Sequence, residues 1–123
     1  TYIKGGEIKM EKKPTRYYSS KQEQKVADWL DGTLTINSGA SYKKGDILLK
    51  DTIVECKTKT KQTISHAIKK EWILYLQKEC IEMGKTHWAI VFDFGTQEIN
   101  KQYVVIPIDD YKEYLDLKEE KDV

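Results

Sequence analysis

Three charged side chains, Asp46, Glu55 and Lys57, stand beside a short apolar stretch and have the residue types that metal-assisted chemistry uses. On a strand, side chains alternate between faces, so Glu55 and Lys57 share one face while Val54 and Cys56 share the other. Burying charges is costly unless they are paired or hold a metal ion. The pattern therefore predicts a functional site at the edge of an apolar sheet.

The segments around these residues indicate how they are positioned. Two apolar runs, residues 47–49 and 53–54, flank the polar step 50–52, a pattern typical of a tight antiparallel hairpin. Asp46 opens the first strand of that hairpin. We therefore expect its carboxylate to approach that of Glu55 across the pair.

These residue types at this spacing favour metal-assisted hydrolysis of a phosphodiester. Asp46 and Glu55 offer hard oxygen ligands that suit Mg²⁺, and the backbone carbonyl of Cys56 is a further candidate ligand. A metal ion there would make bound water a better nucleophile and neutralise charge on the phosphate. Lys57 would either orient that water or stabilise the charge that develops in the transition state.

The same residues carry a resemblance to a known family. Gly45-Asp46, an eight-residue gap and then Glu55-Cys56-Lys57 resemble the PD-(D/E)xK nuclease motif, with Gly45 where the name-giving proline would stand. The short chain and the order of its expected elements are similar to Holliday junction resolvases of the archaeal and phage kind. The resemblance covers residues 20–108. It implies an α/β fold with a restriction-endonuclease-like core, in which helices flank a mixed central β-sheet.

The resemblance also implies an activity and its partners. It implies a Mg²⁺-dependent DNA endonuclease, in which Mn²⁺ can replace Mg²⁺, acting on branched DNA such as a four-way junction during DNA recombination. A junction resolvase must cut two symmetric strands, so a homodimer is expected. The expected location is the cytoplasm of a bacterial, archaeal or phage-infected cell.

Three further residues take candidate roles from the resemblance. Resolvases of this kind carry a first-helix glutamate as an additional metal ligand, here Glu23; alternatively, Glu23 caps that helix by reaching back to the Ser20 backbone. These enzymes contact phosphate through a Gly-Ser element, whereas this chain has Ser38 in the reversed order Ser-Gly and lacks their usual nearby arginine. Lys69 is the candidate for the polar residue of the second helix that faces the site.

Basic side chains on both sides of the motif are candidates for contacts to a DNA backbone. Arg16 precedes two tyrosines, and the lysines after the motif strand would line a DNA groove. The predicted nucleic-acid-binding residues are Arg16, Ser38, Lys43, Lys44, Lys59, Lys61 and Lys69. The alternatives are that the tyrosines pack on protein and that the lysines belong to a solvated loop.

Composition is that of one ordinary globular domain. The chain has 123 residues, of which 39% are hydrophobic and 33% charged, and no apolar run approaches the length of a membrane span. The net charge is only +1, but the first 25 residues are basic and the residues from 109 onward are acidic, which suits a protein that presents one face to phosphates. We expect a basic arm at 1–19, a nuclease domain at 20–117 and an acidic tail at 118–123. The two cysteines, Cys56 and Cys80, should be reduced core residues.

Periodicity and turn residues predict the remaining elements. Helices are expected at 20–30, at 65–83 with a stop at Gly84, and from 109 through 117. Strands are expected at 33–36, with buried strands at 87–94 and 103–108. The helix between the hairpin and strand 87–94 is long enough for a right-handed parallel crossover.

Other functions compete with a junction resolvase. One is another nuclease with the same core, such as a nickase or a repair or restriction-like enzyme. A second is a non-catalytic DNA-binding module that retains the fold. A third possibility is that Glu55 and Lys57 form only a solvated ion pair on an exposed strand.

Overall fold

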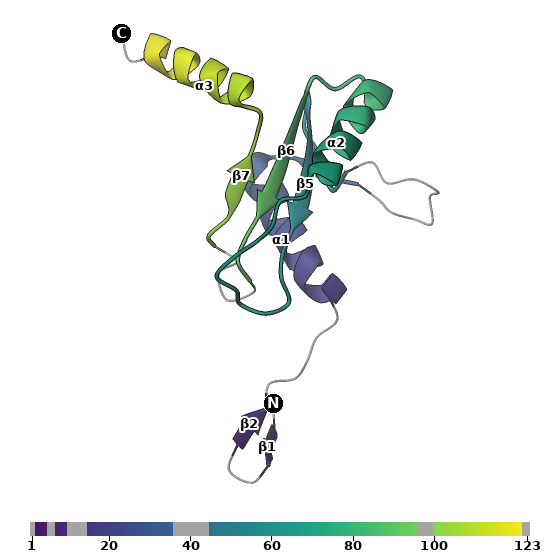
Figure 1. The fold of residues 1–123 in the computed structure, drawn as a ribbon, viewed down its shortest axis with the longest axis vertical. Coiled ribbons are helices and arrows are strands. Elements are labelled where there is room, and N and C mark those ends of the chain that lie inside the picture. The colour runs from purple at the N-terminus through teal and green to yellow at the C-terminus, as the bar shows by residue number, and fades with distance from the viewer. Residues whose placement is uncertain (1, 5–6, 10–14, 36–44, 96–99, 122–123) are drawn as a thin grey trace.

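The structure, a computed structural model, describes residues 2–4, 7–9, 15–35, 45–95 and 100–121. Its elements follow the chain in the order β1 (Tyr2–Lys4), β2 (Glu7–Lys9), α1 (Thr15–Leu30), β3 (Thr33–Leu34), β4 (Ile47–Leu48), β5 (Thr52–Lys57), α2 (Lys70–Met83), β6 (His87–Phe92), β7 (Tyr103–Val105) and α3 (Ile108–Lys121) (Figure 1). β1 and β2 form a separate two-stranded antiparallel sheet.

The main sheet has five strands in the order β3-β4-β5-β6-β7. β4 and β5 form the predicted antiparallel hairpin, in which Ile47 pairs with Val54. β5 and β6 are parallel, and Thr52 pairs with His87 at one end and Lys57 with Phe92 at the other. The other pairings are antiparallel. The predicted mixed α/β class is therefore confirmed, and so is the parallel crossover through α2.

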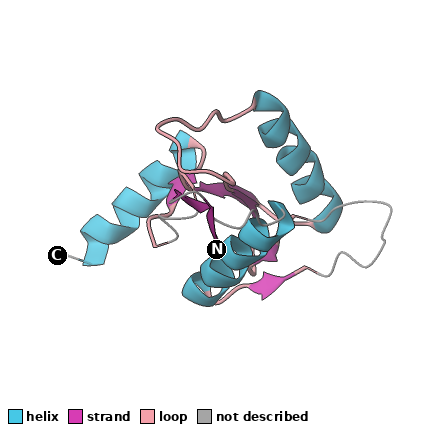
Figure 2. Cartoon of the chain, turned by 90° about the horizontal axis from the view of Figure 1, so that it is seen from below, coloured by secondary structure: helices cyan, strands magenta, loops and turns pink. Residues whose placement is uncertain are grey.

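Two hydrophobic clusters lie on opposite faces of the sheet, because consecutive strand residues point to opposite sides. On one face, α1 packs on the sheet through Val26 and Ala27, which meet Val54, Cys56 and their neighbours. On the other face, α2 packs through Leu76 and Cys80, which meet Ile53, Trp88 and Ile90. Figures 1 and 2 show the sheet between these two helices. Cys56 and Cys80 are both buried and free, as predicted.

The predicted starts of the first two helices are wrong, whereas the third helix begins within one residue of the expected position. α1 begins at Thr15, five residues before the predicted Ser20, because residues 15–19 contain no glycine or proline that would stop a helix. The predicted boundary between arm and domain therefore falls inside α1. α2 begins at Lys70, so Ser65 does not cap it, and its end at Gly84, with a φ of 67°, is as predicted.

The C-terminal elements are more exposed than the sequence suggests. β7 was expected to be buried, but Tyr103 and Val104 are about half exposed because β7 is an edge strand. α3 has no buried residue and projects away from the sheet (Figure 1). It extends through Lys121, into the predicted tail. Within the described residues, no helix combines the length and the apolar character that a membrane span needs.

Candidate functional site

Asp46 is positioned by the bend that leads into β4. Gly45 has a φ of 76°, a value that a residue with a side chain rarely adopts. The Asp46 N–H then donates to the Val54 carbonyl at 3.0 Å, and the Asp46 Oδ2 accepts a hydrogen bond from the Cys56 N–H at 2.6 Å. Asp46 is only 7% exposed. Its carboxylate therefore lies against the backbone that joins Glu55 to Cys56.

Glu55 points to the face of the sheet that α2 covers. Glu55 lies on β5 between Val54 and Cys56, which both pack toward α1, so its side chain points to the α2 face. Asp46 lies in the bend just before β4, and its carboxylate reaches the adjacent stretch of β5 through the Cys56 N–H. Glu55 is 4% exposed. The Asp46 carboxylate thus lies beside the residue that follows Glu55, and the approach of the two carboxylates stays a prediction.

Lys57 extends from the end of β5 on that same face. Its Nζ lies 3.7 Å from the Glu55 Oε1 and 4.4 Å from the centre of the Trp72 ring. Its side chain keeps 27% of its surface exposed. The carboxylate and the negative face of the indole both attract the ammonium group, so Lys57 is held in one place at the mouth of the site.

A depression of about 400 Å³ opens between β5 and α2 at this point. Its lining comprises Glu55, Lys57, Glu71, Trp72, Tyr75 and Leu76. β5 contributes a carboxylate and an ammonium group to this lining, and α2 contributes a second carboxylate and two aromatic rings. A depression with this lining can accept a ligand that carries a charged group next to a flat ring.

Glu79 is a buried carboxylate that the sequence analysis missed. It is 3% exposed, and its Oε2 lies 3.6 Å from the position that a Cβ on Gly45 would occupy. Burial, with a smaller contribution from the Glu79 charge, raises the pKa of the neighbouring Cys80 thiol. The sequence signal was available, because Glu79 falls seven residues after Trp72 and three after Leu76, on the apolar stripe of α2.

A second group of buried polar residues anchors the backbone of Lys57 from the α1 side. Gln22 is fully buried, and its Nε2 donates to the Lys57 carbonyl at 2.7 Å and to the Gln102 Oε1 at 3.0 Å. Gln102 donates to the Asp93 carboxylate at 2.9 Å, and the Thr58 hydroxyl donates to the same carboxylate at 2.6 Å. These contacts link α1, the ends of β5 and β6, and the start of β7. No pattern around Gln22 or Asp93 pointed to this role.

The structure describes only some of the other residues that were predicted to belong to the site. Ser38, Lys43 and Lys44 fall outside the described residues. Glu23 is half-buried on α1, which covers the other face of the sheet, so its role as a ligand stays a prediction. The alternative, a cap at Ser20, is wrong because Ser20 lies inside α1.

The predicted basic contacts lie on the surface. Arg16 is exposed in the first turn of α1, Lys59 is half-buried and Lys61 is exposed. Lys69 is the N-cap residue of α2, with a largely exposed side chain whose Nζ lies 4.0 Å from Glu71 and 5.8 Å from the Trp72 ring. Lys69 therefore borders the depression through Trp72, while Glu79 is the polar residue of α2 that points to the sheet.

The donor set fits a hard divalent cation. Thr52 and Val54 direct their carbonyls to residues on the β4 side of β5, and the Cys56 N–H points the same way. Because the N–H and C=O of one strand residue point to the same side, the Cys56 carbonyl is directed toward Asp46. Two carboxylates and a carbonyl are oxygen ligands of the kind that Mg²⁺ prefers. The carboxylate oxygens of Glu79, Asp46 and Glu55 do not all lie within 4.8 Å of one another. Among the described residues, only a different group of three side chains meets that criterion.

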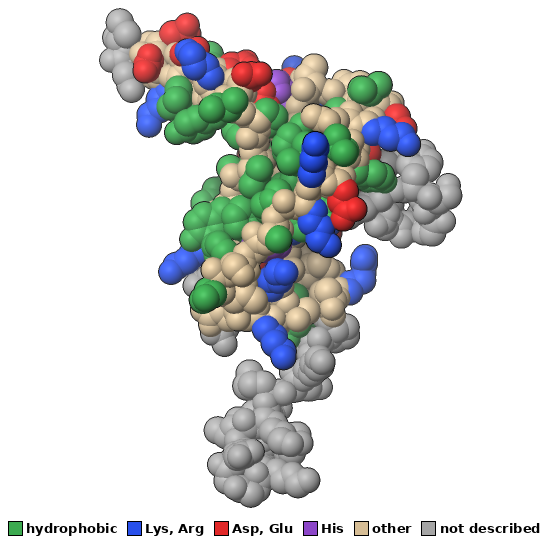
Figure 3. Space-filling model, in the orientation of Figure 1, with side chains coloured by type: hydrophobic (Ala, Val, Ile, Leu, Met, Phe, Trp, Pro, Cys, Tyr) green, Lys and Arg blue, Asp and Glu red, His purple; other side chains and the backbone are tan. Residues whose placement is uncertain are grey.

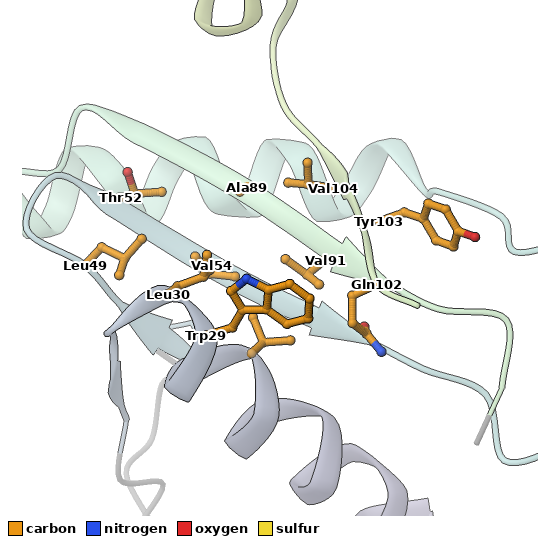
Figure 4. Close-up of a pocket in the computed structure, with 11 residues that line it drawn as sticks. Trp29, Leu30, Leu49, Thr52, Val54, Ala89, Val91, Gln102, Tyr103 and Val104 are labelled. Carbon is orange, nitrogen blue, oxygen red and sulfur yellow. The ribbon is translucent and has the colours of Figure 1, made fainter. Parts of the chain in front are cut away.

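The other large cavity has a different character. It has a volume of about 350 Å³ and lies on the α1 face, between α1 and β7, where Trp29, Leu30, Val54, Ala89, Val91 and Val104 contribute to its lining (Figure 4). Among the residues that the structure describes, no carboxylate, lysine or histidine lines it. The charged depression on the α2 face is therefore the better candidate for chemistry.

Comparison with known proteins adds no relative. No protein-family model, curated protein or solved structure matches the chain. Functional inference therefore depends on the geometry of the residues themselves.

Proposed function

We propose that this chain is a metal-dependent DNA endonuclease with a PD-(D/E)xK-type site on a restriction-endonuclease-like core. The observation that carries the proposal is that the buried Asp46 carboxylate accepts a hydrogen bond from the Cys56 N–H at 2.6 Å, while the Lys57 Nζ lies 3.7 Å from the buried Glu55 next to it. Two buried carboxylates on this stretch are costly unless they are paired or hold a metal ion. A solvated ion pair on an exposed strand does not describe Glu55, which is 4% exposed.

The proposed reaction is hydrolysis of a phosphodiester. Asp46, Glu55 and the Cys56 carbonyl would hold Mg²⁺, with Mn²⁺ as a substitute, and the ion supplies a more acidic water and neutralises phosphate charge. Lys57 donates hydrogen bonds to the attacking water or to the phosphate oxygens as negative charge builds on them. The attacking water gives up a proton to solvent as its oxygen bonds to phosphorus, one P–O ester bond breaks, and the leaving oxygen takes up a proton from solvent.

Branched DNA is the substrate that we propose for this activity. A four-way junction has two strands related by symmetry, so a homodimer with paired sites would cut both. Exposed apolar side chains over β7 and α3 support such an association (Figure 3), among them Val104, Ile108, Tyr111 and Tyr114. Sedimentation of the purified chain tests this part, and a monomer at micromolar concentration would contradict it.

The decisive experiment compares three DNA substrates. The purified chain is incubated with a four-way junction, a linear duplex and single-stranded DNA, each with Mg²⁺ or EDTA. Paired nicks confined to the junction are expected. Cutting of every substrate would instead indicate a nickase, repair or restriction-like nuclease, and tight binding without cutting would indicate a non-catalytic module.

A further inference from the structure

A second group of ligand-type side chains lies at the opposite end of the sheet. His87 begins β6, and Asp110 and Glu113 lie three residues apart in the first turns of α3. One ligand atom from each of these three side chains lies within 4.8 Å of the others, the only such group among the described residues. An imidazole and two carboxylates from two separate elements therefore face one point.

The spacing of these atoms suits a small tetrahedral ion. The His87 Nδ1 and the Asp110 Oδ1 are hydrogen-bonded to each other at a separation of 3.2 Å. In a tetrahedral zinc site, bonds of about 2.0–2.1 Å place neighbouring ligand atoms roughly 3.3 Å apart. Two ligands are thus already at the separation that the ion requires. Glu113 is exposed, so its side chain is free to close the remaining distance.

The surroundings leave room for a fourth ligand. His87, Asp110 and Glu113 border a depression of about 240 Å³, whose floor includes Trp88, Ala89 and Ile106. Water can enter it and complete the coordination. Three protein ligands with one open position is a common arrangement for zinc.

We propose that His87, Asp110 and Glu113 form a binding site for a divalent transition-metal ion, with Zn²⁺ as the best match. An imidazole nitrogen favours zinc and its transition-metal neighbours over Mg²⁺ or Ca²⁺, which prefer oxygen ligands alone. The ion ties α3 to the sheet. α3 has no buried residue, so burial of side chains contributes little to holding it against the sheet.

This site is separate from the proposed nuclease centre. His87 pairs with Thr52 at one end of β5, whereas Lys57 pairs with Phe92 at the other. Five residues of strand separate the two positions, which is about 16 Å. The zinc proposal therefore stands or falls independently of the nuclease proposal.

Zinc titration with matched variants tests the proposal. Zn²⁺ binding to the full chain is measured by calorimetry for the wild type and for His87→Ala, Glu113→Gln, Asp116→Asn and Glu55→Gln. We expect His87→Ala and Glu113→Gln each to weaken one binding event at least ten-fold. Asp116→Asn should leave it unchanged, because Asp116 lies on α3 but pairs with Lys112. Glu55→Gln should also leave it unchanged, because it alters only the other centre.

Hydrogen exchange gives a readout that does not depend on enzymatic activity. Zn²⁺ should slow amide exchange along α3 in the wild type and in Asp116→Asn, but not in Glu113→Gln. Circular dichroism shows whether each variant is folded. The proposal is overturned if the wild type binds no zinc, if its only zinc is lost in Glu55→Gln, or if His87→Ala and Glu113→Gln bind zinc as the wild type does.

Discussion

Substitution of Lys57 most clearly distinguishes a catalytic role from a structural one, because of the environment of its ammonium group. Its ammonium lies between the Glu55 carboxylate and the Trp72 ring, yet its side chain remains partly exposed. Lys57→Ala should lower the cleavage rate by about 10²–10³-fold, the loss typical of removing one transition-state donor. DNA affinity should change only a few-fold, because one exposed charge is lost.

Lys59→Ala is the matched control for that change. Lys59 lies two residues further along, beyond the end of β5. Its removal should weaken binding slightly and leave the rate of bound enzyme intact. Single-turnover cleavage and a separate binding titration distinguish the two effects. A Lys57→Ala variant that cuts like the wild type would remove Lys57 from the mechanism.

The proposed role of Asp46 as a metal ligand can be tested with little disturbance of the fold. In Asp46→Asn, the side-chain oxygen still accepts the hydrogen bond from the Cys56 N–H, but the negative charge is gone. We expect the Mg²⁺ concentration for half-maximal cleavage to rise at least about ten-fold, given that even outer-sphere changes cost 10–100-fold. DNA should bind equally or more tightly without Mg²⁺. Asp51→Asn, at the exposed tip of the hairpin, is the control, and an identical metal titration for both variants would argue against Asp46 as a ligand.

At the scale of elements, the turn into β4 depends on Gly45. Its φ of 76° disfavours any other residue, and a Cβ there would lie 2.3 Å from the Ile53 Cγ2. Gly84, the C-cap of α2, has a similar φ of 67° but nothing within 4 Å of its Cβ position. Substitution of either glycine therefore carries a similar conformational cost, and only substitution of Gly45 adds a steric clash.

Substitution of both glycines isolates that clash. Gly84→Ala should lower the free energy of unfolding by about 1–2 kcal/mol, the cost of a left-handed alanine. Gly45→Ala should cost a further 1–3 kcal/mol or so, because Ile53 must move within a packed core. Chemical denaturation measures both. Equal losses would mean that Ile53 shifts freely and that the turn into β4 is less constrained than its contacts indicate.

Some of the secondary-structure elements could be predicted from the sequence, and others could not. The hairpin and the crossover through α2 followed from local alternation and turn residues, which act over a few positions. The helix starts did not, because residues 15–19 and 65–69 carry no strong signal and packing decides their state. Gln22 could not be found, since its partners Lys57 and Gln102 are 35 and 80 residues away.

At the scale of the whole molecule, charge is unevenly distributed along the sheet. Residues 57–70, which follow the candidate site strand, contain five lysines and no acid. α3 contains six acidic residues and three lysines, and its first turns meet the opposite end of the sheet at His87. A DNA backbone should therefore approach the end that carries Lys57 and avoid the end that carries α3.

The salt dependence of DNA binding directly tests which end of the molecule the DNA approaches. Each lysine that neutralises a phosphate contributes about 0.9 to the slope of log affinity against log salt concentration. Lys59→Ala with Lys61→Ala should therefore reduce the slope by about 2, uniformly for junction and duplex DNA. The matched pair Lys118→Ala with Lys121→Ala removes the same charge from the last turn of α3 and should leave the slope unchanged. Equal slopes for the two double variants would mean that DNA does not distinguish the ends of the molecule, and the approach direction inferred from the charge pattern would be wrong.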